Sequence, residues 1–140
     1  ILGEYDDVFS REGISLQTDF PDKIVLNANQ QFFRDILQNL IDNSVKAMAN
    51  SKPKVIRCSY EVQNDMLEIL VSDTGIGIPQ EDHEQIFALY YTTTELQGGA
   101  GIGLYIVKTR VQSLGGSVAV VDSEFGEIGT TIKITIPFKK

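Results

Sequence analysis

Apolar and polar residues alternate along several short segments of the chain, which is typical of half-buried β-strands. The clearest pair covers residues 55–62 and 66–73, and the turn Gln63-Asn64-Asp65 between them predicts a hairpin. The same pattern predicts strands over residues 13–20, 23–26, 117–122 and 130–138, the last two as a second hairpin. A polar stretch with glycines and no period, residues 90–101, predicts a mobile loop.

Helical spacing of apolar residues appears in three other segments. The strongest is 30–50, where Phe33, Leu37, Ile41 and Met48 share one face. A short helix is predicted over 80–87 after Pro79, and another over 104–114 with Gly115-Gly116 as its end. The order of elements is not a regular βαβ alternation. It predicts a two-layer α/β sandwich, in which a mixed, mostly antiparallel sheet is covered on one face by three helices.

Two polar residues continue apolar strand faces. Asp73 follows Leu67, Ile69 and Val71 on one face, and Thr130 precedes Ile132, Ile134 and Ile136 on another. A buried carboxylate needs a partner. Gly75 and Gly77, just after it, permit close approach of a flat ligand, so Asp73 is a candidate ligand-binding residue. A threonine at a strand end is by itself more often structural.

A polar stripe runs along the predicted helix 30–50. Asn39, Asn43 and Lys46 fall within roughly 60° of one another on a helical wheel. A solvated helix face explains such a stripe, but amide oxygens also suit Mg²⁺ and a lysine suits phosphate. The glycines of residues 98–103 precede the helix at Leu104, where free backbone amides can bind phosphate. Flexible glycine loops without a ligand are also common.

Composition narrows the classes of function. The chain has 140 residues, 42% hydrophobic and 22% charged, which is typical of one folded domain. Its net charge of −7 argues against nucleic-acid binding. Cys58 is the single cysteine, so an internal disulfide and a multi-cysteine metal site are excluded, and a reducing compartment fits. The sequence has no membrane-spanning stretch or signal peptide, and its start at Ile1 favours a piece of a longer protein.

Known nucleotide motifs are incomplete here. Neither Gly75-Ile76-Gly77 nor Gly99-Ala100-Gly101-Ile102-Gly103 completes the dinucleotide fingerprint, and the P-loop and protein-kinase signatures are missing. The order of segments is more specific. Asn39, Asp42, Asn43 and Lys46, then residues 73–79, 86–93, 99–104 and 129–131, resemble the N, G1, F, G2 and G3 boxes of sensor histidine kinases. The chain thus resembles their catalytic, ATP-binding domain, which has the Bergerat fold of the GHKL superfamily.

The resemblance implies roles for individual residues. Asp73 would accept the adenine amino group, supported by Thr130 through water, while Asn43, with Asn39 as a second contact, would bind Mg²⁺ and Lys46 would bind phosphate. Asn39, Asn43 and Lys46 are the implied catalytic residues. The implied ATP-binding residues are Asn39, Asn43, Lys46, Asp73, Gly75, Gly77, Ile78, Tyr90, Thr92, Thr93, Gly99, Gly101, Ile102, Gly103, Leu104 and Thr130.

The resemblance also implies a reaction and its partners. The γ-phosphoryl group of ATP would pass to a histidine on a separate dimerisation domain of the same protein, and a response regulator receiver domain would follow. His83 is interpreted as a surface histidine rather than this acceptor. Residues 1–10 would end the connecting segment and 11–140 form the catalytic domain. This fragment would be monomeric and cytoplasmic, without membrane contact, in a homodimeric protein whose membrane anchoring is left open.

Two alternatives stay open at this point. An anti-sigma-factor serine kinase has the same fold but phosphorylates a serine, and a non-catalytic module would sense ATP or dock a partner without phosphoryl transfer.

Overall fold

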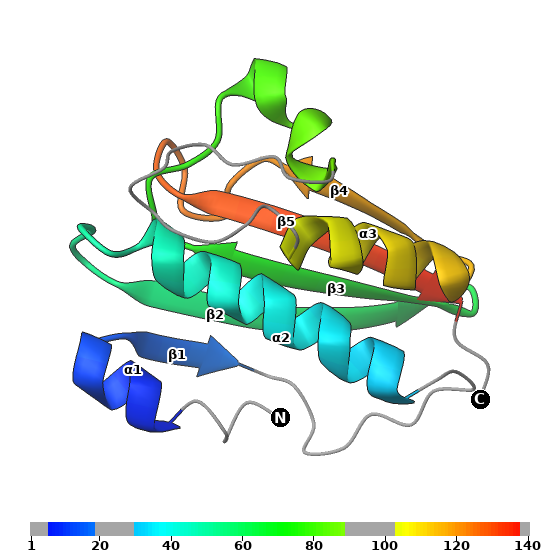
Figure 1. Ribbon diagram of the computed structural model, residues 1–140, viewed down its shortest axis with the longest axis horizontal. Coiled ribbons are helices and arrows are strands. Elements are labelled where there is room, and N and C mark those ends of the chain that lie inside the picture. Colours follow the sequence, from blue (N-terminus) through cyan, green and yellow to red (C-terminus); the bar gives the residue numbers. More distant parts are fainter. Residues whose placement is uncertain (1–5, 19–29, 89–102, 138–140) are drawn as a thin grey trace.

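The computed structural model describes residues 6–18, 30–88 and 103–137. The elements, in chain order, are α1 (Asp6–Glu12), β1 (Ser15–Thr18), α2 (Gln30–Ala47), β2 (Val55–Gln63), β3 (Met66–Asp73), the 3-10 turns η2 (Gln80–Asp82) and η3 (Gln85–Phe87), α3 (Gly103–Ser113), β4 (Ser117–Val121) and β5 (Thr130–Pro137). The strands form one sheet in the order β1-β2-β3-β5-β4 (Figure 1). Among the strands of the described residues, only the β1–β2 pair is parallel.

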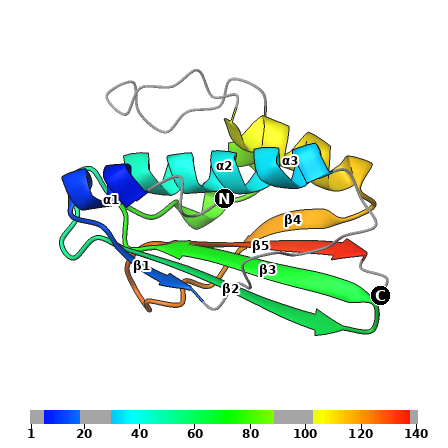
Figure 2. The same cartoon turned by 90° about the horizontal axis from the view of Figure 1, so that it is seen from below.

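The three α-helices lie on one face of this sheet, as the side view shows (Figure 2). The core lies between the two layers. Its largest fully buried side chains include Ile36, Leu40 and Ile41 of α2, which face Ile69 of β3 and Ile134 of β5. The predicted architecture is therefore confirmed: a two-layer α/β sandwich with a mixed, mostly antiparallel sheet.

The third helix on the sheet is not the predicted one. Residues 80–87 form two 3-10 turns instead of one helix. An α-helix this short has few hydrogen bonds to offset its nucleation cost, and 3-10 turns are common in short pieces. The segment still contributes Ile86 and Phe87 to the core.

Helix α1 was not predicted from the sequence. Asp6 and Asp7 occupy its first turn and Arg11 its last, which matches the helix dipole. It ends just before Gly13, whose φ of +70° lets the backbone turn, and the amide of Ile14 donates to the carbonyl of Phe9 at 2.9 Å. Phe9 is buried in the core, so α1 is packed onto the domain. The predicted boundary between 1–10 and 11–140 falls inside this helix and stays a prediction.

Most other predicted elements match closely. The hairpin turn at Asn64 and Asp65 has positive φ at both residues, as a tight two-residue turn requires. Helix α3 ends in front of Gly115, which has φ +82°. The strand predicted over 13–20 begins later, at Ser15, and its described part reaches Thr18, while helix α2 ends at Ala47 rather than residue 50. The strand predicted over 23–26 lies outside the described residues, as does the loop of 90–101.

Candidate functional site

Asp73 and Thr130 face each other across two central strands. Asp73 is the last residue of β3 and Thr130 the first of β5, and they are direct partners in the antiparallel register. Both side chains are buried, with 3% and 6% of their surface exposed. They are on the strand face that packs against the helices, because Val71 and Ile132, two residues further into the sheet, belong to the core. The predicted positions of both residues on apolar faces agree with the structure.

The carboxylate of Asp73 has hydrogen-bond donors from two elements. The amide of Gly75 donates to its Oδ1 at 2.8 Å, and the hydroxyl of Ser44 in α2 donates as well. These bonds favour the ionised form, but burial outweighs them and raises the pKa of Asp73 to about 6. A carboxyl group with this pKa, on the side of the sheet that faces the helices, is a candidate for a functional site. A ligand that donates a hydrogen bond to it would offset the free-energy cost of burying its charge.

Glycines hold the segment after Asp73 close to its neighbours. A side chain at Gly75 would place its Cβ 2.7 Å from the carbonyl oxygen of Ala47, at the end of α2. Gly77 has φ +77° and lies against Gly129, where a Cβ would be 3.3 Å from the carbonyl oxygen. The amide of Ile76 donates to Ala47 at 3.1 Å. The turn after β3 is thus fixed between the end of α2 and the start of β5.

The first residue of the polar stripe of α2, Asn39, lies beside the start of α3. The Nδ2 of Asn39 donates to the carbonyl of Asp35 at 2.7 Å, which leaves its Oδ1 as an acceptor beside Gly103, where a Cβ would be 3.1 Å away. Asn43 is half-buried and makes no hydrogen bond to the residues that the structure describes, and Lys46 is exposed. Two amide groups and one ammonium group are therefore available on this side of α2.

Helices α2 and α3 are also joined by charge. The Nε of Arg110 in α3 lies 3.3 Å from Oδ2 of Asp35, whose backbone carbonyl holds Asn39. This ion pair fixes the first Asn of the stripe relative to Gly103, the first residue of α3.

Of the remaining candidate residues, two lie within the described part of the chain and six lie outside it. Ile78 and Leu104 are partly buried and pack against the core. Candidates between residues 89 and 102 lie outside the described residues: Tyr90, Thr92, Thr93, Gly99, Gly101 and Ile102.

Three residues near the site were not predicted from the sequence to have a role there. Ser44 donates a hydrogen bond to Asp73. It lies four residues after Leu40 on the apolar face of α2, and this polar residue on an apolar face is a signal in the sequence that could have identified it. The hydroxyl of Thr74 donates to the carbonyl of Pro53 at 2.6 Å and accepts from the amide of Val55 at 3.0 Å. His83, partly exposed, has its Nε2 2.9 Å from the carbonyl oxygen of Ile78.

A known family matches most of the chain. Residues 28–140 match the family described as histidine kinase-, DNA gyrase B-, and HSP90-like ATPase. The chain belongs to this ATPase family. The matched region contains every residue of the candidate site, whereas α1 and β1 precede it.

Curated relatives of this ATPase domain are sensor proteins. The chain is 41% identical over 108 residues to the aerobic respiration control sensor protein ArcB of Escherichia coli strain K12, covering 74% of this chain and 13% of that protein. It is 34% identical over 125 residues to the sensor histidine kinase WalK of Bacillus subtilis strain 168, covering 86% and 20%. The chain therefore spans a fifth or less of the length of these two relatives.

Solved structures share the fold. The catalytic domain of histidine kinase ThkA superimposes with a TM-score of 0.80 at 24% identity, covering 97% of this chain and 86% of that one. The mycobacterial sensor histidine kinase MprB gives a TM-score of 0.77 at 22% identity, covering 98% and 91%. Full-length ShkA in complex with AMPPNP gives 0.80 at 24% identity, covering 99% and 28%. Among the described residues, no helix is long and apolar enough to cross a membrane.

Proposed function

We propose that this chain is the catalytic domain of a sensor histidine kinase, which binds ATP and transfers its γ-phosphoryl group to a histidine on a separate dimerisation domain. The observation that carries the proposal is the buried carboxylate of Asp73, placed opposite Thr130 and supported by Ser44. An adenine amino group donates hydrogen bonds and has a flat apolar ring beside it. Such a ligand satisfies a carboxylate that is otherwise buried at a cost.

The phosphates of ATP are assigned to the polar stripe of α2, rather than to the apolar face that carries Ser44. Lys46 supplies a positive charge, and the first residues of α3 supply backbone amides at a helix start. Asn43 and the oriented Oδ1 of Asn39 are oxygen donors of the kind that Mg²⁺ prefers, and Asn43 has no competing hydrogen bond among the described residues. When bound there, Mg²⁺ would neutralise charge on the phosphates.

The reaction that this proposal implies is an in-line displacement. A ring nitrogen of the acceptor histidine attacks the γ-phosphorus, the bond to the oxygen bridging the β- and γ-phosphates breaks, ADP leaves, and the imidazole proton passes to solvent. The domain contributes by positioning the nucleotide and neutralising charge. His83, whose Nε2 lies 2.9 Å from the carbonyl oxygen of Ile78, is not the acceptor on this proposal, which assigns that role to a histidine of the separate domain.

The arrangement of the whole protein is part of the proposal. The acceptor histidine would lie on a dimerisation domain joined to this one before α1, and a response regulator receiver domain would take the phosphoryl group from it. The relatives' greater length is consistent with such additional domains.

Two measurements test the function. Calorimetry of the chain with ATP, with and without Mg²⁺, should show binding that Mg²⁺ strengthens. Mixing the chain and labelled ATP with a purified dimerisation domain that carries the acceptor histidine should give an acid-labile, alkali-stable phosphoprotein. Absence of ATP binding would contradict the nucleotide assignment. Acid-stable phosphoserine on the partner would identify a serine kinase instead, and ATP binding with no transfer to any acceptor would identify a sensing module.

A further inference from the structure

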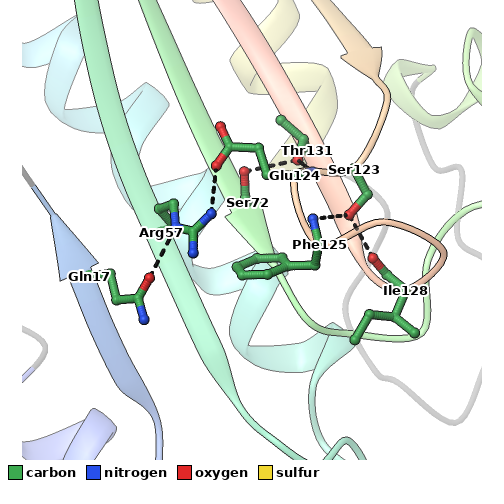
Figure 3. A network of polar contacts seen from close by, with 8 residues as sticks. All are labelled: Gln17, Arg57, Ser72, Ser123, Glu124, Phe125, Ile128 and Thr131. Carbon is green, nitrogen blue, oxygen red and sulfur yellow. Dashed lines mark hydrogen bonds and ion pairs between the residues drawn. The ribbon is translucent and has the colours of Figure 1, made fainter.

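The connection between β4 and β5, residues 122–129, lies over one part of the sheet face opposite the helices. Ser72 and Thr131 point to that face, since they alternate with Asp73 and Thr130, yet both are fully buried. Their hydroxyl groups are 2.9 Å apart, and the amide of Glu124 donates to Thr131 at 3.0 Å (Figure 3). The connection therefore lies directly behind the pair that we assign to adenine.

The connection is held in shape by one serine. The hydroxyl of Ser123 donates to the carbonyl of Ile128 at 2.6 Å and accepts from the amide of Phe125 at 3.1 Å. These bonds join the beginning of the connection to its end (Figure 3). A shift of Glu124 or Phe125 would therefore be passed to Ile128 and to the residue after it.

Arg57 of β2 fastens this connection to the sheet. Its Nη1 lies 3.3 Å from Oε2 of Glu124, and its guanidinium carbon is 4.7 Å from the centre of the Phe125 ring. Its Nε donates to Gln17 of β1 at 3.0 Å. Both charged side chains of the ion pair are mostly shielded, with 38% and 24% of their surface exposed. One guanidinium thus combines an ion pair, a cation–π contact and a hydrogen bond (Figure 3).

The connection ends at Gly129, which touches the base-recognition segment. Its φ is +80°, and a Cβ there would overlap the carbonyl oxygen of Asp73 and lie 3.1 Å from Cα of Thr74. Its own carbonyl lies against Gly77. Because Thr130 follows directly, the position of Gly129 determines how Thr130 and Asp73 are spaced.

We propose that Arg57, acting through Glu124 and Phe125, is a positioning residue for adenine recognition from the far side of the sheet. The proposal rests on the proposed function, since it takes Asp73 and Thr130 as the base-binding pair. Release of Arg57 loosens the connection, lets Gly129 move, and weakens the base contact. The phosphate contacts lie on α2 and α3 and do not share residues with this network. The loss in affinity is therefore the same factor for AMP, ADP and ATP.

The test compares nucleotide affinities at a temperature where all variants are folded. Arg57→Gln should weaken the binding of AMP, ADP and ATP alike, by roughly 2- to 30-fold, which corresponds to the 0.5–2 kcal/mol typical of substitutions in coupled networks. Glu124→Gln should weaken nucleotide binding less than Arg57→Gln does. The double variant should bind about as weakly as Arg57→Gln alone, since both changes break the same ion pair. Glu68→Gln is the matched control, because Glu68 pairs with Lys133 at 3.0 Å on the same sheet face, away from the connection.

Three outcomes would overturn the proposal. Wild-type affinity in Arg57→Gln, with only a lower melting temperature, would assign Arg57 to fold stability. A loss for ATP without a loss for AMP would place its effect at the phosphates. An equal loss in Glu68→Gln would mean that any broken ion pair on this face weakens binding. If the wild-type chain bound no adenine nucleotide, the proposed function would fail and this inference with it, whereas the three outcomes above overturn the inference alone.

Discussion

The hydroxyl of Ser44 in the last turn of α2 hydrogen-bonds the carboxylate of Asp73 at the end of β3. This contact joins the helical layer to the sheet at the one buried carboxylate of the described residues. It lowers the cost of the buried charge without removing it, since the pKa of Asp73 is still raised to about 6. Because burial and hydrogen bonding act in opposite directions on this carboxylate, the site should be sensitive to pH and to removal of the charge of Asp73.

Stability should fall with rising pH because of Asp73. In the unfolded chain this carboxyl titrates at its ordinary value of 3.8, and in the folded domain at about 6. Between these values the folded state binds more protons, so the stabilisation is complete below pH 3.8 and is lost as the pH rises through 6. The shift corresponds to about 3 kcal/mol. Denaturant unfolding from pH 4 to 7 should show this loss in the wild type relative to Asp73→Asn, whereas parallel curves for the two proteins would contradict the assignment.

Asp73→Asn should bind ATP more weakly although it folds well at neutral pH. The amide keeps the shape of the side chain and ends the burial of a charge, but it replaces one acceptor oxygen with a donor that faces the adenine amino group. A lost hydrogen bond to a charged acceptor corresponds to about 1.5–3 kcal/mol, or roughly 10- to 100-fold in affinity. Calorimetry at pH 7.5 measures it. Asp65→Asn in the exposed hairpin turn removes the same charge and should bind like the wild type; ATP binding by Asp73→Asn at wild-type strength would rule out the base contact.

Gly129→Ala should destabilise the domain much more than Gly126→Ala. The two glycines lie in the same connection with nearly equal φ, +80° and +81°. Only Gly129 touches Asp73 and Thr74, whereas a Cβ at Gly126 meets nothing within 4 Å. Backbone strain alone should cost about 1 kcal/mol at either position. The overlap at Gly129 should add about 1–3 kcal/mol. Urea unfolding of both variants checks the difference, and equal losses would show that the contact with Asp73 relaxes freely.

Asn43→Ala should remove the gain in ATP affinity that Mg²⁺ provides and leave stability nearly unchanged. Asn43 has no hydrogen bond to lose among the described residues, and alanine favours a helix. The measurement is ATP binding in Mg²⁺ and in chelator, alongside thermal unfolding. A variant that still responds to Mg²⁺ like the wild type would exclude Asn43 as a ligand.

Lys46→Ala should weaken ATP more than AMP, since its charge is assigned to the phosphates. A loss of about 1.5–3 kcal/mol is expected for ATP. Lys52→Ala, in the exposed turn after α2, removes an equal charge and serves as the control. An equal loss of ATP affinity in both lysine variants would indicate a general effect of charge rather than a phosphate contact.

The strands that position Asp73 and Thr130 could be predicted because alternation fixes which face a side chain occupies. The hairpin register then follows from the turn at Asn64 and Asp65. Helix α1 could not be predicted in this way, because its seven residues are too few for a helical period and its packing depends mainly on Phe9.

Contacts between residues that are distant in the chain could not be predicted from the sequence. Arg57 and Glu124 are 67 positions apart, and neither interrupts an apolar pattern. Ser44 does interrupt one, yet a hydroxyl on an apolar helix face does not reveal its partner. Such contacts depend on how the two layers and the β4–β5 connection are placed, which local patterns do not specify.

Ser72 and Asp73 are neighbours in the chain, but their side chains lie on opposite faces of the sheet, and the same holds for Thr131 and Thr130. A deletion or insertion of one residue within β3 would exchange the two faces, placing a hydroxyl where adenine is expected and a carboxylate beneath the β4–β5 connection. Strand β3 should therefore tolerate a change of length far less than a substitution at a half-buried position such as Glu68.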